Sequence, residues 1–562
     1  MSTGGLEVAY LLPLIFILLL HLLAASRRGR RGSKDDAADH HKQQQLPPSP
    51  PALPIIGHLH LVGDLPHVSL RDLAAKHGPD LMLLRLGTVP TVIASSPRAA
   101  QAILRTHDHV FASRPSSTVV DALLYGCSSD IAFAPYGEHW RQARKLVTAH
   151  LFTVKKVHAY RHARKQEVSL VMTKIREAAA TSTVVDISEM MNAFANDMVS
   201  RAVSGKFFRE EGRSKLFREL VDTNTLVLGG FSLEEYFPGL ANSLGFLNRW
   251  FPRNRQARHT HKRWDHLLET IIRDHETRNA SMHPARNDDQ AAAESDFTDV
   301  LLSVQQDYGI TRDHIKAILV DMFGAGTDTS SLVLGFAMAE LIRNPQHMTK
   351  LQGEVRRHTP EGQEMVDEEN LASMAYLKAV VKETLRLHQP APLLLPHLSM
   401  ADCVVEGYSI PSGTRVIINS WAISRDPESW EKPEEFMPER FMDGGSAAAI
   451  DFKGKDFEFL PFGAGRRICP GLNFGLATVE IMLANLVYCF DWQLPNGMEA
   501  KDVDMTEVFG LTVHPKEKLM LIPKLRIGAS VAAARPAELR PGLSGAQQAT
   551  GTEVAGRGLR GG

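Results

Sequence analysis

The sequence predicts a mainly α-helical fold with a minor β part, contained in one large domain. Long segments with helix start and stop signals dominate the chain, and the longest, of roughly thirty residues, runs from a capping Thr311 to Asn344 and Pro345. Runs rich in β-branched residues are few and short. The candidate functional residues are scattered from Trp140 to Cys469, and they can form one site only if a single domain brings them together.

Residues 1–26 are predicted to form a membrane anchor. Leu6 to Ala25 is almost continuously apolar and long enough to cross a bilayer as one helix. A cleaved signal peptide, the alternative, normally carries its positive charge before the apolar stretch. Here the basic residues follow it: Arg27, Arg28, Arg30, Arg31 and Lys34. The positive-inside rule therefore predicts a lumenal N-terminus and a cytosolic catalytic domain.

The rest of the chain divides into a linker, a catalytic domain and a tail. Residues 27–46 are basic and polar, and the proline-rich stretch that follows them favours a stiff segment that sets the tilt of the domain against the membrane. The catalytic domain is expected over 47–526. Residues 527–562 are rich in Gly, Ala and Arg, and we expect them to be disordered. A net charge of −1 gives no indication of nucleic-acid binding.

Two hairpins make up the expected β part. The run 81–86, followed by a turn at Gly87 and the run 92–94, predicts the first. The runs 404–405 and 416–418, separated by a Pro-Ser-Gly turn at 411–413, predict the second.

The long helix contains a segment that is unfavourable for a helix, Ala325 to Ser330. Gly326 costs about 1 kcal/mol relative to alanine in a helix interior. Thr329 can donate a hydrogen bond to the carbonyl of Ala325, four residues earlier, and such bonds bend helices. The opened groove could hold dioxygen, with Thr329 donating a hydrogen bond and Asp328 relaying protons. A kinked core helix with a satisfied threonine is the alternative.

Glu383 and Arg386 share one helix face at a spacing of i, i+3. As an exposed pair they would contribute little. Arg440, in the segment 436–441, offers a second guanidinium downstream.

Cys469 lies in a segment suited to holding a sulfur ligand on iron. Gly463 and Gly465 permit tight bends, and Arg467 could grip a carboxylate such as a haem propionate. Pro470 and the glycine after it suit a helix start, whose free N–H groups favour a thiolate. A thiolate on haem iron favours O–O cleavage, which implies oxygen chemistry. The alternative is a small buried hydrophobic residue in a glycine-rich turn. The other cysteines have no zinc or disulfide spacing: Cys127, Cys403 and Cys489.

The run Phe462 to Gly471 resembles the haem-binding signature Phe-x-x-Gly-x-Arg-x-Cys-x-Gly of the cytochrome P450 superfamily. The resemblance covers 47–526 and implies a single haem-thiolate monooxygenase domain with haem b, in which Thr329 and Asp328 deliver protons. It implies that Glu383, Arg386 and Arg440 form a structural triad that holds the cysteine loop. His397 stands where the family commonly has Arg, so its role toward a propionate is less well supported. The implied haem-binding residues are Cys469 (the metal ligand), Arg467, Trp140, Arg144, His397, Phe462 and Gly463.

The resemblance points to the plant microsomal branch, and three stretches are similar to grass enzymes that hydroxylate indole-derived intermediates of benzoxazinoid defence compounds. These stretches are 128–137, 228–238 and 505–513. Such closeness indicates a clade and not a substrate, so hydroxylation of terpenoids or phenylpropanoids stays open. An isomerase or dehydratase that needs no external electrons is a further alternative, although such relatives usually lose the threonine that is kept here. The pocket residues implied by analogy are Leu124, Tyr125, Phe323, Leu393, Leu394, Phe509 and Leu511.

The implied partners are O2, a small hydrophobic metabolite and an NADPH–cytochrome P450 reductase, with cytochrome b5 as a further partner. The two Gly-x-Gly runs, at 324–326 and 463–465, do not open a helix after a strand, so neither predicts a dinucleotide site. Electrons are therefore expected from a separate flavoprotein on the same membrane. The implied location is the endoplasmic reticulum membrane, with a single membrane pass.

Overall fold

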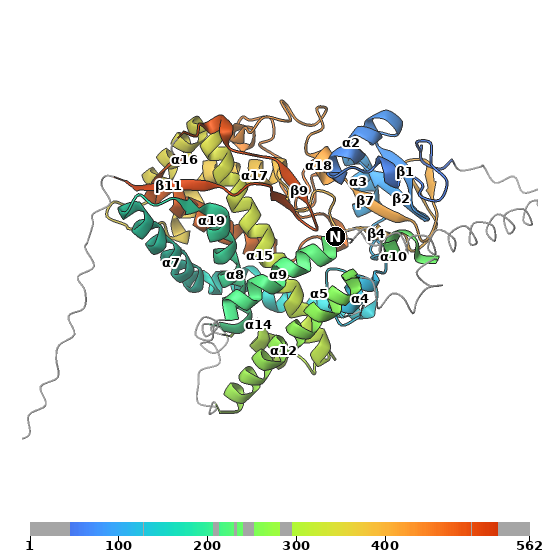
Figure 1. The fold of residues 1–562 in the computed structure, drawn as a ribbon, viewed down its shortest axis with the longest axis horizontal. Coiled ribbons are helices and arrows are strands. Elements are labelled where there is room, and N and C mark those ends of the chain that lie inside the picture. The colour runs from blue at the N-terminus through green and yellow to red at the C-terminus, as the bar shows by residue number, and fades with distance from the viewer. Residues whose placement is uncertain are drawn as a thin grey trace, which may run out of the picture.

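The computed structural model describes residues 45–526, apart from 127–128, 206–212, 230–232, 240–251, 282–294 and 496. The predicted anchor, nearly all of the linker and the C-terminal tail lie outside the described residues. Figure 1 shows a helical part at the left and centre, and a smaller part that contains β1, β2 and β7 at the upper right. The prediction of a mainly helical fold with a minor β part is confirmed.

Helices account for most of the described chain. They are α2 (Pro66–His77), α3 (Pro97–Gln101), α4 (Thr118–Leu123), α5 (Glu138–Leu146), α6 (Val154–Ala159), α7 (Arg161–Ala180), α8 (Ile187–Ser204), α9 (Arg213–Gly229), α10 (Leu233–Tyr236), α12 (Pro252–Ser281), α14 (Phe297–Ser303), α15 (Arg312–Arg343), α16 (Pro345–His358), α17 (Ala375–Leu387), α18 (Ser420–Ile423) and α19 (Leu472–Cys489).

The strands are short. They are β1 (Leu81–Leu86), β2 (Val89–Ala94), β3 (Val185–Asp186), β4 (His397–Leu398), β5 (Cys403–Val405), β6 (Tyr408–Ile410), β7 (Arg415–Ile418), β8 (Phe490–Gln493), β9 (Glu507–Phe509), β10 (Val513–Pro515) and β11 (Met520–Leu525).

The helix α15 is the central element of the core. Its N-cap is Thr311, as predicted, and the chain leaves the helix at Asn344. It packs against α8, α9, α17 and α19. By length and composition α15 and α19 could each cross a membrane, but 78 % and 67 % of their most apolar windows are buried. Both are therefore core helices of the folded domain.

The first predicted hairpin is present and the second is wrong. β1 and β2 pair antiparallel, with Leu83 opposite Val92. β5 pairs with β6 instead of with β7. The reason is the two-residue turn at Glu406 and Gly407, which both have positive φ (49° and 82°) and so close a tight hairpin. The turn at 411–413 carries β7 away to pair in parallel with β2, in a sheet of order β1-β2-β7-β4.

Two further small sheets bring the C-terminal segments back to the helices. β11 lies between β3 and β8, and β9 pairs antiparallel with β10. The β9–β10 hairpin places Phe509 and Thr512 near α15 and the segment 390–396.

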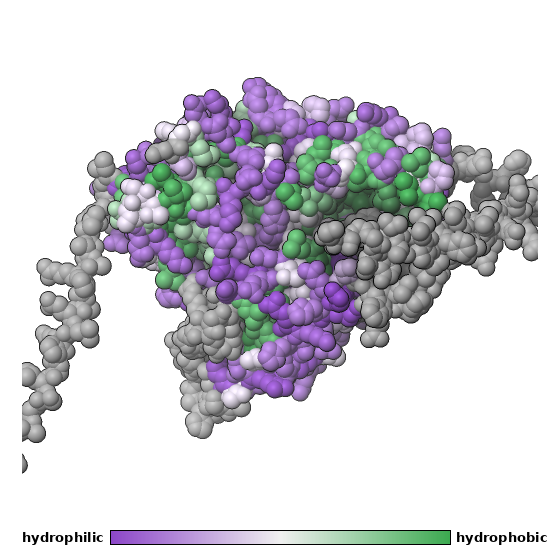
Figure 2. Space-filling model, viewed as in Figure 1, coloured by the Kyte–Doolittle hydropathy of each residue, from purple (hydrophilic) through white to green (hydrophobic). Residues whose placement is uncertain are grey.

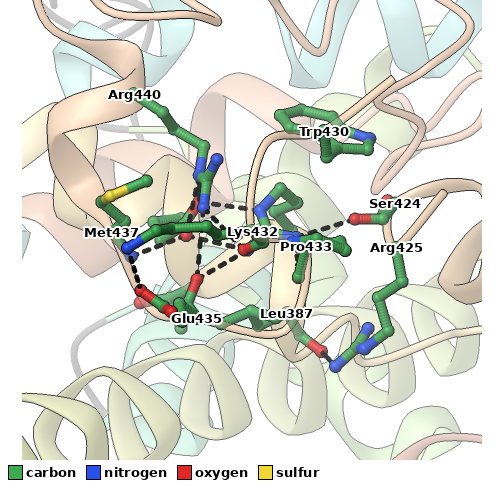
Figure 3. A network of polar contacts seen from close by, with 12 residues as sticks. Leu387, Ser424, Arg425, Trp430, Lys432, Pro433, Glu435, Met437 and Arg440 are labelled. Atoms are coloured by element: carbon green, nitrogen blue, oxygen red, sulfur yellow. Dashed lines mark hydrogen bonds and ion pairs between the residues drawn. The ribbon is translucent and has the colours of Figure 1, made fainter. Parts of the chain in front are cut away.

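The predicted triad of Glu383, Arg386 and Arg440 is a fully buried charge network. Figure 3 shows Arg440 among the loop residues that surround it. The carboxylate of Glu383 accepts two hydrogen bonds from Arg386, both 2.8 Å long, and two from Nε of Arg440, 3.0 and 3.1 Å long. It also accepts the backbone N–H of Met437 at 2.8 Å. The remaining guanidinium N–H groups donate to backbone carbonyls between residues 424 and 435, in the loop that leads to Arg440. These carbonyls belong to Ser424, Glu431, Lys432, Pro433 and Glu435.

Aromatic contacts join this loop to the segment before Cys469. The rings of Trp430 and Phe441 lie 6.0 and 5.5 Å from that of Phe459. Phe452 contacts Phe459 at 6.1 Å and Phe462 at 5.5 Å. The triad therefore fixes a loop whose aromatic residues in turn fix the start of the cysteine segment.

We expect Glu383→Gln to lower the free energy of unfolding by about 3–5 kcal/mol, because it leaves two buried guanidinium groups without an anion. Urea unfolding followed by circular dichroism measures the change. The control is Glu428→Gln, an exposed carboxylate in the same loop, for which a change within about 0.5 kcal/mol is expected. Equal stability of the two variants would contradict the structural role of the triad.

Candidate functional site

Cys469 lies between a short helical turn, Gly465–Arg467, and the start of α19 at Leu472. Its backbone N–H donates to the carbonyl of Phe462 at 3.0 Å, which closes the segment into a loop. The backbone N–H groups of Gly471 and Leu472 point to the sulfur as hydrogen-bond donors. Although protein surrounds the residue, its side chain stays partly uncovered.

The loop depends on glycine at one position above all. Gly465 has φ +65°, and a Cβ there would lie 2.1 Å from the carbonyl oxygen of Leu104. Only glycine accepts both the conformation and the close approach.

Burial raises the pKa of the Cys469 thiol, and the N–H groups of the following helix and the charge of Arg144 only partly oppose this. A protein environment alone therefore does not keep this sulfur ionised. A bound metal cation deprotonates a coordinating thiol outright, so the position suits a metal ligand.

Two arginines at the loop, Arg144 and Arg467, donate to backbone carbonyls. Arg467 donates to Ala112 (2.7 Å), Ile131 (3.1 Å) and Ala134 (2.6 Å). Its guanidinium lies 4.1 Å from the ring of Trp140, which itself donates from Nε1 to Ile131 at 3.0 Å. Arg144 donates to the carbonyl of Ile468. The structure thus brings the predicted residues Trp140, Arg144, Arg467 and Cys469 together.

Arg114 is a member of this cluster that the sequence analysis missed. It is buried and donates to Ala132 at 3.0 Å, Leu395 at 2.8 Å and Pro396 at 2.9 Å. The sequence signal, an arginine before Pro115, is too common to single it out. A second missed residue, Asp321 on α15, accepts the backbone N–H groups of Ile131 and Ala132.

The cluster carries more buried positive charge than the protein neutralises. Desolvation lowers the pKa of Arg114 to about 10, and desolvation together with the charge of Arg114 lowers that of Arg467 to about 9. The neighbouring carboxyl, Asp130, has a pKa raised by burial to about 6. A ligand with two carboxylates would relieve this excess, and haem has two propionates. The donor set therefore fits haem.

His397 is buried next to the cluster, with Nδ1 2.7 Å from the carbonyl oxygen of Phe111. Desolvation, with the charge of Arg114, lowers its pKa to about 3. In the neutral ring, Nδ1–H donates to the carbonyl, which leaves Nε2 as an acceptor. The expected donation to a propionate would therefore require the protonated ring, which a nearby propionate would favour.

A partly exposed stripe, called here the bare stripe, interrupts the buried middle of α15. Ala325 is exposed and Gly324, Gly326 and Thr329 are half-buried, although the other residues from Ile315 to Ile342 are buried. As predicted, the hydroxyl of Thr329 donates to the carbonyl of Ala325, at 2.7 Å. The glycine at position 326 is explained by helix packing and not by the expected groove, because a Cβ there would lie 2.7 Å from the side chain of Val199 in α8. This glycine permits close helix packing.

Asp328 points away from the stripe, toward the β9–β10 hairpin. It is buried and accepts a hydrogen bond from Thr512. His514 Nε2 lies 3.2 Å from its carboxylate.

An apolar cavity of about 220 Å³ lies between α2, α4, α10 and the segment 391–396. Leu393, Leu394, Phe509 and Leu511 line it, and its polar lining includes Arg114, Ser117 and Glu235. Ser117 donates to Glu235 at 2.7 Å.

Three residues expected in the pocket do not line this cavity. Phe323 is fully buried and stacks on Phe217 (ring centroids 4.1 Å apart) and against Trp264, so it belongs to the aromatic core. Tyr125 turns its hydroxyl to Asp265 at 3.1 Å. Leu124 is buried in the main hydrophobic cluster. Each of these apolar or amphipathic side chains contacts α9, α12 or the hydrophobic core instead of the cavity.

Comparison with known proteins gives a consistent result. The family model described as Cytochrome P450 matches residues 47–522. Relatives from Zea mays include an indole-2-monooxygenase, 57 % identical over 85 % of this chain and 87 % of its own length. An indolin-2-one monooxygenase and a 3-hydroxyindolin-2-one monooxygenase, also from Zea mays, are 52 % and 51 % identical, each over 85 % of this chain and 88 % of its own length. A zebrafish cytochrome P450 solved with abiraterone superposes with a TM-score of 0.67 at 25 % identity, over 83 % of this chain and all of that one.

We expect Arg114→Gln to lower the apparent affinity for haem by about tenfold or more, because hydrogen bonds from a charged donor are worth about 1.5–3 kcal/mol each. The ratio of haem absorbance to protein after dilution measures this. Arg105→Gln, an exposed arginine, is the control and should retain haem. Equal retention by both variants would remove Arg114 from the site.

Proposed function

The chain belongs to the cytochrome P450 family and is a haem-thiolate monooxygenase, and we propose that it inserts one atom of O2 into indole or an oxidised indole derivative. The substrate assignment depends on the sequence identity of 51–57 % to three indole-derivative monooxygenases, over most of each chain. The apolar cavity with few polar groups suits a small flat aromatic molecule.

Within the site we assign Cys469 as the iron ligand. Trp140, Arg144 and Arg467 would hold the haem propionates, with Arg114 and His397 beside them, while Phe462 and Gly463 shape the loop. When bound, haem supplies the activation of O2, and the thiolate donates electron density that favours O–O cleavage. Support comes from the surplus of buried positive charge and from the partly uncovered sulfur.

Thr329 and Asp328 are proposed to manage protons. The hydroxyl of Thr329 lies on the bare stripe of α15, where it can donate to bound oxygen once it leaves the carbonyl of Ala325. Asp328 precedes it on the neighbouring face of the helix and contacts Thr512 and His514. Retention of this threonine argues against an isomerase that uses no external electrons.

The enzyme uses a redox partner, and we propose that the partner is an NADPH–cytochrome P450 reductase, with cytochrome b5 as a second donor. We also propose residues 1–26 as a single membrane pass in the endoplasmic reticulum, with 27–46 as linker and 47–526 as the cytosolic catalytic domain. Exposed apolar residues near the start of the domain, Leu46, Leu53 and Ile56, support membrane contact at the end that carries β1 and β2. Figure 2 shows hydrophobic surface over this end of the molecule.

The ligand assignment predicts that the ferrous–CO complex shows the red-shifted Soret band of thiolate ligation and that Cys469→Ala abolishes it. Cys403→Ala is the matched control, because Cys403 is a half-buried residue of β5 and should keep the band. A normal band in the Cys469 variant would disprove the assignment.

The substrate proposal predicts that indole or indolin-2-one shifts the Soret spectrum of the purified enzyme and yields a hydroxylated product with NADPH and a plant reductase. A terpene and a phenylpropanoid of similar size are the comparison ligands. Product from those alone would overturn the indole assignment. Product formed from any of these compounds without an electron donor would contradict the need for a reductase.

A further inference from the structure

A second cavity, of about 430 Å³, reaches Asp328 on a face of α15 next to the bare stripe. It lies between α8, α9, α15 and β10, and most of the residues that line it are polar or charged. Asp328 and His514 both line it, and Asp222 of α9 is exposed at its mouth. The cavity therefore connects solvent with a carboxylate that is itself only 4 % exposed.

Three side chains form a compact polar group at the inner end of this cavity. Thr512 donates its hydroxyl hydrogen to Asp328, and His514 Nε2 lies 3.2 Å from the same carboxylate oxygen. Nε2 also lies 3.0 Å from the hydroxyl oxygen of Thr512. The side chain of His514 is 39 % exposed, so the ring touches both the buried carboxylate and the cavity.

We propose that His514 is a positioning and relay residue that carries protons from water in this cavity to Asp328 during turnover. The inference rests on the proposed role of Asp328 in proton delivery and adds the route by which that carboxylate is protonated again after each transfer.

The chemistry balances with the established activity. Insertion of one oxygen atom consumes O2, two electrons from the redox partner and two protons, and it releases one water. Imidazolium His514 gives the proton on Nε2 to the Asp328 carboxylate and becomes neutral. It regains a proton at the same nitrogen from cavity water, so the residue ends each cycle unchanged.

The charged groups around His514 favour its protonated form. Burial alone would lower its pKa, but the hydrogen bond and the charge of Asp328, helped by Asp222, raise it above the usual value. The other charged groups that line the cavity are largely paired: Arg218 with Glu189 at 2.8 Å, and Lys518 with Asp186 at 2.7 Å. Lys215 and Glu219 of α9, together with Glu517, complete the charged lining. Asp222 has no salt-bridge partner among the described residues, and it can collect protons at the mouth.

A purely structural role explains the geometry less well. Thr512 already fastens the β9–β10 hairpin to α15 through Asp328, and it is buried. A second anchor would not need a titratable, half-exposed ring in a polar cavity.

The first test measures the protonation of His514 in the haem-loaded enzyme without turnover. Diethylpyrocarbonate reacts with neutral imidazole, and mass spectrometry reports the modification of each histidine as a function of pH. The midpoint for His514 should lie at higher pH than that of exposed His77. In Asp328→Asn the midpoint for His514 should fall toward that of His77. Equal midpoints for His514 and His77 in the wild-type enzyme would overturn the proposal.

The second test uses His514→Gln, which keeps a hydrogen bond to Asp328 but does not titrate. With indole and a reductase, product per NADPH should fall by about tenfold and peroxide should rise, a smaller loss than the roughly 100-fold or more of a general acid, because water carries part of the flux. Wild-type coupling should decrease as the pH rises through the raised pKa of His514, because the imidazolium is lost, whereas the variant should show no such step. His77→Gln is the control and should match the wild type.

Asp328→Asn and His514→Gln must first show the ferrous–CO band and the thermal unfolding midpoint of the wild type. If indole gives no product even with the wild type, the substrate proposal fails, but peroxide released per NADPH without substrate still tests His514. Unchanged peroxide yield and an unchanged pH profile in His514→Gln would overturn the relay.

Discussion

One buried carboxylate, that of Glu383, holds together the segments on which the catalytic site depends. It is the only anion in contact with the guanidinium groups of Arg386 and Arg440 among the described residues, and those groups in turn bind carbonyls along the loop 424–435. Trp430 of that loop packs against Phe459. Phe452 in turn contacts both Phe459 and Phe462, and the carbonyl of Phe462 closes the loop of Cys469. An apolar replacement of the triad would leave many buried carbonyls without donors, so charge and hydrogen bonding act together here.

The site itself is built with an electrostatic deficit. Arg114, Arg144 and Arg467 are desolvated and bind neutral carbonyls, and the pKa of each is lowered by its burial. Haem propionates would supply the missing negative charge in the proposed site, so that cofactor binding and stability of the folded domain would be coupled through the same side chains.

Neighbouring faces of α15 present different surroundings to the two residues proposed to manage protons. Thr329 lies on the bare stripe, whereas its neighbour Asp328 faces Thr512, His514 and the second cavity. Adjacent helix residues point about 100° apart, so a single turn can separate the oxygen site from the proton supply. The short β9–β10 hairpin contributes to both sides, because Phe509 and Leu511 line the apolar cavity and His514 lines the polar one.

The sequence by itself determined whatever depends on local spacing. It predicted the bounds of α15, the bond from Thr329 to Ala325, the first hairpin and the loop around Cys469, because each rests on residues within a few positions of one another. Only the tertiary structure decided the contacts between distant segments. It paired β7 with β2, brought Arg114 to the carbonyls at 395–396, turned Phe323 to Phe217 and placed His514 beside Asp328. Such contacts depend on how whole elements pack, and one amphipathic or apolar side chain has many equivalent partners until that packing is fixed.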